Sequence, residues 1–250
     1  MMRKFLMLIV FILALIAGLF AFTPLGFVLN QSGVGNMGIG WAKVDGTLMK
    51  GRISGFYAGT QPIGDVSLKL RPLSLVTLSP SYDVQWGGAG GQGTATLTLS
   101  RSTVTAEQIR MRLEIGALEG LEPAVRAMGG TLDVDDGAFE LTRTGCETAA
   151  GNLSTTSLST LASQYGRQFG AISGPISCES GSFKIAMAGE SDVGDQVNID
   201  ARANILGGGD FATRVRTQDT QLILALTQIG FVRENGEFVY RQSRTVGLTQ

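Results

Sequence analysis

The chain has 250 residues, of which 44 % are hydrophobic and 16 % are charged, against about 25 % charged residues in an average soluble domain. Its formal net charge of −1 gives no bulk electrostatic reason to expect nucleic-acid binding. It contains no histidine and two cysteines, which excludes Ser-His and Cys-His catalysis and leaves too few thiolates for a four-cysteine metal site. Composition therefore favours a protein that is not an enzyme and holds no cofactor.

An apolar run near the amino terminus predicts a membrane anchor. Residues 5–22 carry no charge and follow Arg3 and Lys4. As a helix this run would be about 27 Å long, close to the hydrocarbon thickness of a bilayer. It is longer than the roughly 7–15 apolar residues of a typical signal peptide, and no clear Ala-x-Ala cleavage site follows it. A cleaved signal peptide remains the alternative.

This anchor divides the chain into five expected parts. The positive-inside bias keeps residues 1–4 in the cytoplasm as a short tip. We expect a transmembrane helix over 5–22, a linker over 23–42, an exported β-rich domain over 43–241 and a tail over 242–250. Export to an oxidising compartment would permit a disulfide.

Most of the exported part alternates between apolar and polar residues, which is typical of half-buried strands. The clearest examples are residues 66–70, 94–99 and 109–115. Helical spacing of apolar residues instead predicts three helices, over 117–128, 156–169 and 219–230, with Asp219 near the start of the third.

A similar phrase follows each predicted helix. Asp136-Gly137, Ser180-Gly181 and Asn235-Gly236 lie between alternating apolar residues, which is a strong hairpin signal. The recurrence suggests an internal repeat of helix and hairpin, although chance similarity in a glycine-rich chain is the alternative. The predicted fold is mainly β: a long antiparallel twisted sheet built of hairpins, with a few short helices packed on it, preceded by one amino-terminal transmembrane helix.

The two cysteines are expected to form a disulfide. Cys146 follows the strand of the first predicted hairpin, and Cys178 lies in the opening strand of the second. If these hairpins are neighbours in the sheet, the side chains fall within bridging distance. Closing a loop of this length would contribute about 3–4 kcal/mol. Two buried free thiols are the alternative.

The acidic residues give no clear chemical site. Asp133, Asp135 and Asp136 could suggest calcium, but a dedicated loop has more oxygen ligands and a later acidic closure, so turn chemistry explains them better. Without a carboxylate pair at a recognisable spacing, a polysaccharide hydrolase is also disfavoured. We therefore predict no catalytic, cofactor-binding or metal-binding residue.

Two short phrases carry a family resemblance. Val44-Asp-Gly46-Thr47-Leu48-Met-Lys-Gly51 is followed by Leu68-Lys-Leu-Arg-Pro72-Leu-Ser-Leu75. Together they resemble the type II secretion system protein N family, with Met49 and Leu68 where that family commonly has tryptophan. The hairpin beginning at Gly130 and the closing segment that ends at Phe238 are also similar to it.

The resemblance implies an accessory inner-membrane component of the secretion pathway, with one membrane span, a periplasmic β-rich domain and other secretion subunits as partners. Gly46, Thr47, Leu48, Gly51 and Pro72 would then have structural roles in turns and strand packing. The leading hypothesis is a non-enzymatic scaffold that supports export of folded proteins from the periplasm. The alternative is an AsmA-like lipid-binding or lipid-transfer protein, and the discriminating feature is whether the predicted helices cover the apolar face of the sheet.

Overall fold

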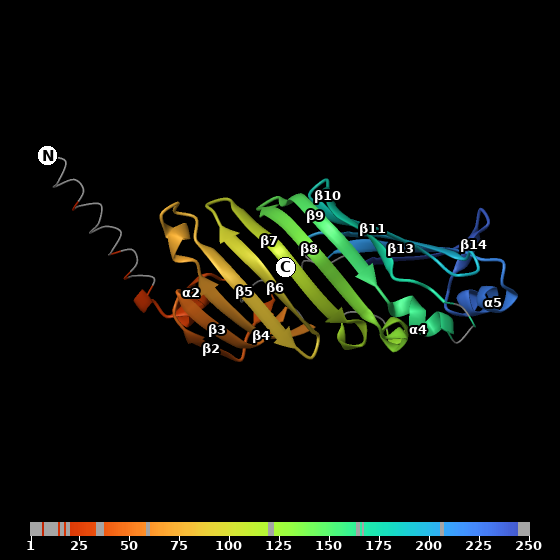
Figure 1. The fold of residues 1–250 in the computed structure, drawn as a ribbon, viewed down its shortest axis with the longest axis horizontal. Coiled ribbons are helices and arrows are strands. Elements are labelled where there is room, and N and C mark those ends of the chain that lie inside the picture. The colour runs from red at the N-terminus through yellow and green to blue at the C-terminus, as the bar shows by residue number, and fades with distance from the viewer. Residues whose placement is uncertain are drawn as a thin grey trace. The chain divides into compact units, whose positions relative to one another are not determined.

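The computed structural model describes residues 7, 15, 18, 21–33, 38–58, 61–119, 123–163, 166, 168–205 and 208–244 (Figure 1). They belong to two compact units, Met1–Ala106 and Glu107–Gln250. Fifteen strands and a few short helices are found in these residues, and their strand pairs are antiparallel. The predicted mainly β, antiparallel fold is confirmed.

The predicted anchor lies outside the described residues, apart from positions 7, 15, 18, 21 and 22. Among the residues that are described, no helix is long and apolar enough to span a bilayer.

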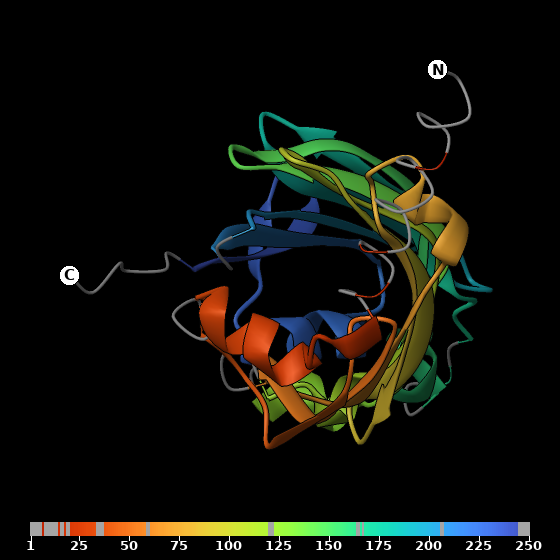
Figure 2. The ribbon, with the colours of Figure 1, turned by 90° about the vertical axis from the view of Figure 1, so that its left-hand side faces the viewer.

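The first unit pairs helix α2 with a sheet. Its strands follow the order β1-β3-β4-β5-β6, and β2 pairs with β3. The elements are α2 (Leu25–Gln31), β1 (Ile39–Gly40), β2 (Lys43–Gly46), β3 (Lys50–Ala58), β4 (Gln61–Leu70), the 3-10 helix η2 (Pro72–Leu75), β5 (Ser81–Gly88) and β6 (Gly91–Leu99). Figure 2 shows α2, in red, beside the orange strands β2 and β3.

The core of the first unit lies between α2 and one face of this sheet. Leu25 of α2, Ile53 of β3 and Val66 of β4 are each less than a tenth exposed. Val44, Leu48 and Trp86 are among the partly buried side chains around them. Part of the predicted linker over 23–42 is therefore folded, because α2 contributes a buried leucine to the core.

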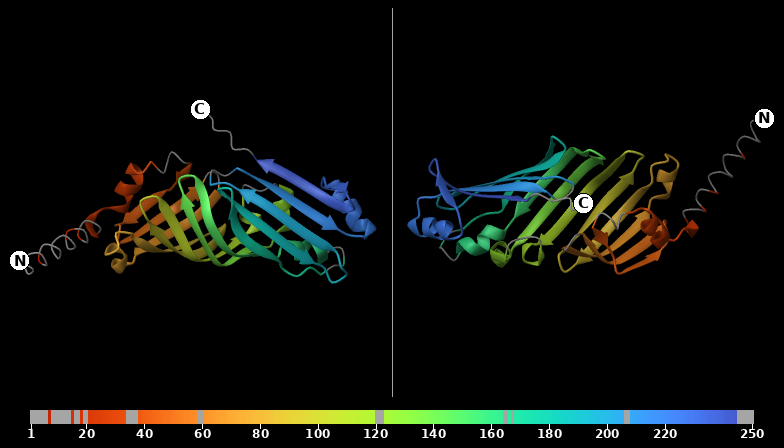
Figure 3. Two further views of the ribbon diagram at one scale, coloured as in Figure 1. Left: turned by 90° about the horizontal axis from the view of Figure 1, so that it is seen from above. Right: turned by 180° about the vertical axis from the view of Figure 1, so that it is seen from behind.

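The second unit follows β7 (Thr103–Glu114), which runs across the boundary between the units. Its strands follow the order β8-β9-β10-β11-β12-β13-β15-β14. The elements are η3 (Ile115–Ala117), α3 (Pro123–Met128), β8 (Thr131–Thr142), β9 (Gly145–Thr155), α4 (Ser157–Ser163), β10 (Ile172–Glu179), β11 (Ser182–Glu190), β12 (Gln196–Ala203), β13 (Gly209–Arg216), α5 (Thr220–Gln228), β14 (Val232–Glu234) and β15 (Glu237–Arg244). Figure 3 shows α5, in blue, next to the last strands of this unit.

The three predicted helices differ in how closely the structure follows them. The helix over 219–230 is confirmed as α5, and the Asp219 carboxylate caps it by accepting from the backbone N–H of Gln221 and Leu222 at 2.8 and 2.9 Å. The helix over 156–169 is confirmed as α4 over Ser157–Ser163, and residues 164, 165 and 167 of the prediction lie outside the described residues. The helix over 117–128 is present as η3 and α3. Pro123 is the first residue of α3. Proline suits this position because the first N–H groups of a helix have no partner within the helix, and proline lacks an N–H.

The hairpin predicted at Gly137 is wrong. Strand β8 continues through this residue, with a register shift between Asp135 and Ala138, and the turn to β9 comes later, between Thr142 and Gly145. A Cβ atom at Gly137 would lie 2.9 Å from the Val134 side chain. The glycine thus marks a β-bulge with close packing, which produces the same Asp-Gly signal as a turn.

The other two glycine turns lie where the sequence places them. Ser180 and Gly181 connect β10 to β11, and Asn235 and Gly236 connect β14 to β15. All four residues have positive φ, between 50° and 87°. This matches a type I′ turn, the two-residue turn that fits the twist of a hairpin.

Candidate functional site

The residues of the first family-like phrase form a tight turn between β2 and β3. Gly46 and Gly51 lie opposite each other, and the Thr47 N–H donates to the Lys50 carbonyl at 3.0 Å. Gly46 has a φ of +88°, which glycine adopts without strain. A side chain on Gly51 would overlap Leu25. Glycine at this position therefore allows α2 to approach the sheet closely.

The same turn holds the chain that enters α2. The Leu48 N–H donates to the Thr23 carbonyl at 3.1 Å, and Thr47 forms a β-bridge with Pro24. Leu48 itself packs against the buried cluster that contains Leu25. These contacts fix the position of Thr23 and Pro24 against the turn between β2 and β3.

Pro72 lies near this turn, at the start of η2. A hydrogen bond links the end of β4 to this turn: the Leu70 N–H donates to the Met49 carbonyl at 2.9 Å. The structure therefore brings the two family-like phrases together at one edge of the first unit, as a structural junction.

Cys146 of β9 and Cys178 of β10 are joined in a disulfide, with their Cα atoms 5.7 Å apart. The ladder between these strands runs only as far as the pair Pro175 and Asn152. Proline has no N–H to donate to a ladder, so the disulfide holds the strands together beyond the point where it stops. Because both thiols are used, neither cysteine is available as a nucleophile.

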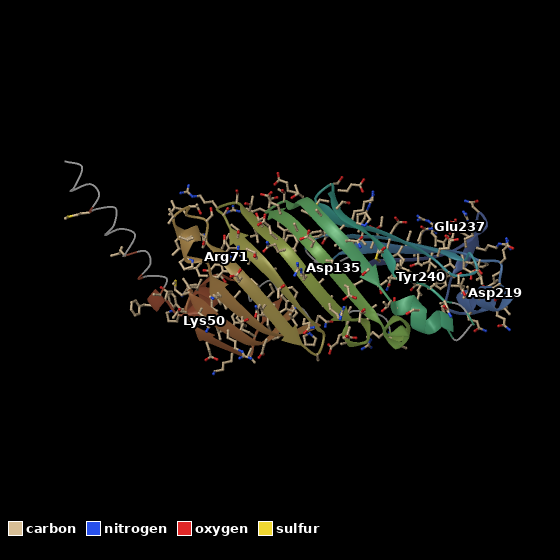
Figure 4. The ribbon with its side chains drawn as sticks, viewed as in Figure 1. Lys50, Arg71, Asp135, Asp219, Glu237 and Tyr240 are labelled. Carbon is tan, nitrogen blue, oxygen red and sulfur yellow. A yellow bond between two sulfur atoms is a disulfide. The ribbon has the colours of Figure 1, made fainter. Side chains whose placement is uncertain are left out.

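Of the three acidic residues that could suggest calcium, Asp133 has both an ion-pair partner and a hydroxyl partner. Asp133 accepts from Arg112 Nε at 2.5 Å and from the Thr131 hydroxyl at 2.8 Å, and Figure 4 labels Asp135 along β8. In the described part of the chain, no group of three or more His, Cys, Asp or Glu residues could hold a metal ion.

Ion pairing keeps several exposed carboxylates charged. The pKa of Glu179 is lowered by a hydrogen bond from Lys184 and by the nearby charge of Arg202. A hydrogen bond from Arg241 lowers the pKa of Glu234 in the same way. A general acid needs a raised pKa, so these carboxylates behave as structural ion pairs.

The largest apolar cluster lies in the second unit, and its buried members come from seven strands and one helix. Ile172, at the start of β10, is fully buried, and Val197 of β12 and Phe238 of β15 are 2 % and 4 % exposed. The other buried members are Val134, Leu153, Met187, Val215 and Leu226. This cluster is the apolar face on which the lipid-binding alternative depends.

Helices α4 and α5 cover part of that face. Leu226 of α5 is 7 % exposed within the cluster, and Leu222 and Ile223 of the same helix pack against it. Leu158 of α4 packs there as well. Side chains of α4 and α5 therefore cover part of this apolar cluster.

The last strand in the order of the second unit leaves one edge without a neighbouring strand. Among the strands that are described, β14 pairs with β15 alone. Val232 of β14 is 62 % exposed, and Ile229 just before it is 52 % exposed. Unpaired backbone groups with exposed apolar side chains are suited to pairing with a strand from another chain. The sequence did not predict this edge strand, because the stretch from Ile229 to Glu234 is too short to show a clear alternation of apolar and polar residues.

Comparison with known proteins gives one match. No curated protein and no solved structure is significantly similar to the chain. The family model described as type II secretion system (T2SS), protein N, matches residues 37–241. That range holds both family-like phrases, the disulfide and every strand from β1 to β14. The chain therefore belongs to the type II secretion system protein N family.

Proposed function

We propose that the chain is a non-enzymatic scaffold of the type II secretion system, which supports export of folded proteins from the periplasm of a bacterium. Family membership supports a role in the secretion machinery. The observation that favours a scaffold over a lipid carrier is the packing of α5, because Leu226 fills the apolar face of the second unit.

In this proposal residues 5–22 span the inner membrane once, residues 1–4 stay in the cytoplasm, and residues 43–241 form the periplasmic β-rich domain, joined by 23–42 and followed by the tail 242–250. The apolar run and the preceding Arg3 and Lys4 support this orientation. Such an anchor confines the folded part to a thin layer at the membrane, which raises its effective concentration near other membrane-bound subunits.

The partner is another secretion subunit, and it binds through an extended strand added to the free edge of β14. The edge supplies unpaired backbone groups, and the exposed Val232 supplies apolar contact. Arg233 lies over the Phe238 ring at 6.0 Å and Glu234 pairs with Arg241, so both charged side chains of β14 are already engaged within the hairpin.

The test is a secretion assay in a strain that lacks the gene, complemented by variants. The unmodified chain should restore export to the medium, whereas Val232→Lys should leave substrates in the periplasm, because a lysine on an edge strand blocks strand addition. Ile205→Lys is the matched control, since Ile205 is 44 % exposed and lies outside β14. If the strain that lacks the gene secretes every substrate normally, the proposal is contradicted.

Lipid carriage predicts a different outcome from the same strain. Secretion would be unaffected, and the exported part, purified without the anchor over residues 5–22, would retain phospholipid in native mass spectra. Under the scaffold proposal, Leu226 fills the apolar face and the exported part retains no phospholipid.

A further inference from the structure

The loop between β4 and β5 exposes unusually large apolar side chains. Leu73 is 85 % exposed, Val76 68 % and Leu78 74 %. Residues 72–80 contain no charged side chain. Arg71, just before the loop, is turned to the sheet, where it pairs with Asp83 at 2.7 Å. The loop is thus an uncharged apolar tip on the first unit, and contiguous exposed apolar surface of this kind marks an interaction site.

Local hydrogen bonds satisfy much of this loop's backbone. The Val76 N–H donates to the Leu73 carbonyl and the Leu78 N–H to the Leu75 carbonyl, both at 3.2 Å. The hydroxyl of Ser74 donates to the Arg71 carbonyl at 2.6 Å, and that of Thr77 donates to the Ser74 carbonyl at 2.8 Å. Internal satisfaction of polar groups lowers the cost of moving a segment from water toward lipid.

Leu78 has a strained backbone conformation. Its φ is +56°, a left-handed conformation that a leucine adopts rarely. Burial does not offset this cost, since the side chain is exposed. Strain at an exposed apolar residue points to a role in binding.

The loop lies at the edge from which the predicted anchor leaves. The Thr23 carbonyl accepts from Leu48, and the neighbouring Met49 carbonyl accepts from Leu70, which lies three residues before Leu73. Figure 4 labels Lys50 and Arg71 at this end of the first unit, and Lys50 faces Lys69 across β3 and β4. These like charges repel each other, and anionic lipid headgroups would neutralise them.

We propose that residues 72–80 insert Leu73, Val76 and Leu78 into the interface of the lipid bilayer that residues 5–22 span. The inference rests on the membrane anchor of the proposed function. It adds a second membrane contact, which fixes the first unit against the bilayer surface where a single helix would leave it free to rotate. The occupant is lipid, because the hydrogen-bonded edge keeps the loop within a few residues of the point where the chain enters the membrane.

The test uses the full-length chain in vesicles of phosphatidylethanolamine and phosphatidylglycerol. Leu73→Cys provides a site for an environment-sensitive fluorophore, since the two native cysteines are joined to each other. Gln92→Cys is the matched control: Gln92 is exposed and lies at the opposite end of the strands, where it faces Gly87. Fluorescence of Trp41 and Trp86, which both lie in the first unit, verifies before labelling that this unit folds in each variant.

We expect the label at position 73 to shift its emission to the blue and to lose intensity with brominated lipid, while the label at position 92 does neither. Leu78→Asn should reduce the quenching at position 73 without lowering stability, because asparagine tolerates the left-handed conformation. Equal emission and quenching at both positions would overturn the inference. A blue shift without quenching would show that the label is buried against protein and not against lipid, and would overturn it as well. Flotation separates the two proposals: a chain that fails to float with vesicles refutes the anchor and the loop together, whereas a chain that floats unquenched refutes the loop alone.

Discussion

Leu226→Ala tests whether the apolar face of the second unit is a packed core. Leu226 lies on α5, is 7 % exposed and belongs to the buried cluster that includes Ile172 and Phe238. Truncating a buried leucine to alanine costs about 2–5 kcal/mol, depending on how far the surroundings collapse into the cavity. The neighbours here come from several strands held in one ladder, which leaves little room for collapse, so we expect a value in the upper half of that range.

Leu224→Ala is the matched control. It makes the same chemical change on the same helix, but Leu224 is 62 % exposed. Substitutions at such positions change stability by no more than about 0.5 kcal/mol. The difference between the two variants therefore isolates burial from helix propensity.

Urea unfolding followed by far-ultraviolet circular dichroism measures the effect. With a denaturant slope of about 2 kcal/mol per molar, Leu226→Ala should lower the midpoint by roughly 1.8–2.5 M and Leu224→Ala by no more than about 0.3 M. Tryptophan fluorescence is unsuitable, because Trp41 and Trp86 both lie in the first unit. If the two variants unfold at the same midpoint, α5 does not cover the apolar face and the argument against a lipid trough fails.

Three further predictions follow from the second unit. Cys178→Ser should lower the free energy of unfolding by about 2–4 kcal/mol, since it opens the loop closed with Cys146; an unchanged urea midpoint would contradict this. Asp219→Ala should cost about 1 kcal/mol by removing the cap of α5, seen as faster amide exchange in that helix and contradicted by unchanged exchange. Glu179 and Glu234 have pKa values lowered from the ordinary 4.5. The stability that their ion pairs contribute is therefore present above pH 4.5 and is lost as the pH falls through the lowered pKa values. Urea midpoints that rise below pH 4.5 would contradict this pairing.

The sequence predicted correctly those elements that depend on residues close to one another in the chain. The alternation at Val66 and Leu70 describes a strand with one buried face, and both are less than a tenth exposed in β4. Asp219 marks the start of α5 because a side-chain cap needs only the backbone N–H groups two and three residues later. The turns at Gly181 and Gly236 follow for the same reason, since positive φ is a property of the turn itself.

Elements that depend on contacts distant in sequence could not be located in the same way. Gly137 has the signal of a turn, but the bulge is imposed by pairing between β8 and β9. Helix α2 precedes the sheet with no polar face to mark it, and its position depends on the space that Gly51 leaves for Leu25. The exposed side chain of Leu73 is likewise visible only once the loop is folded, since its composition resembles that of a buried segment.

Photocrosslinking in the native bacterium tests the central claim most directly. A photoreactive amino acid replaces Val232 at the free edge of β14 in one strain and Ile205, outside that strand, in another. The scaffold account predicts an adduct at position 232 that mass spectrometry identifies as a type II secretion subunit, and no such adduct at position 205. The absence of a secretion subunit at position 232, or the same adduct at both positions, would contradict it.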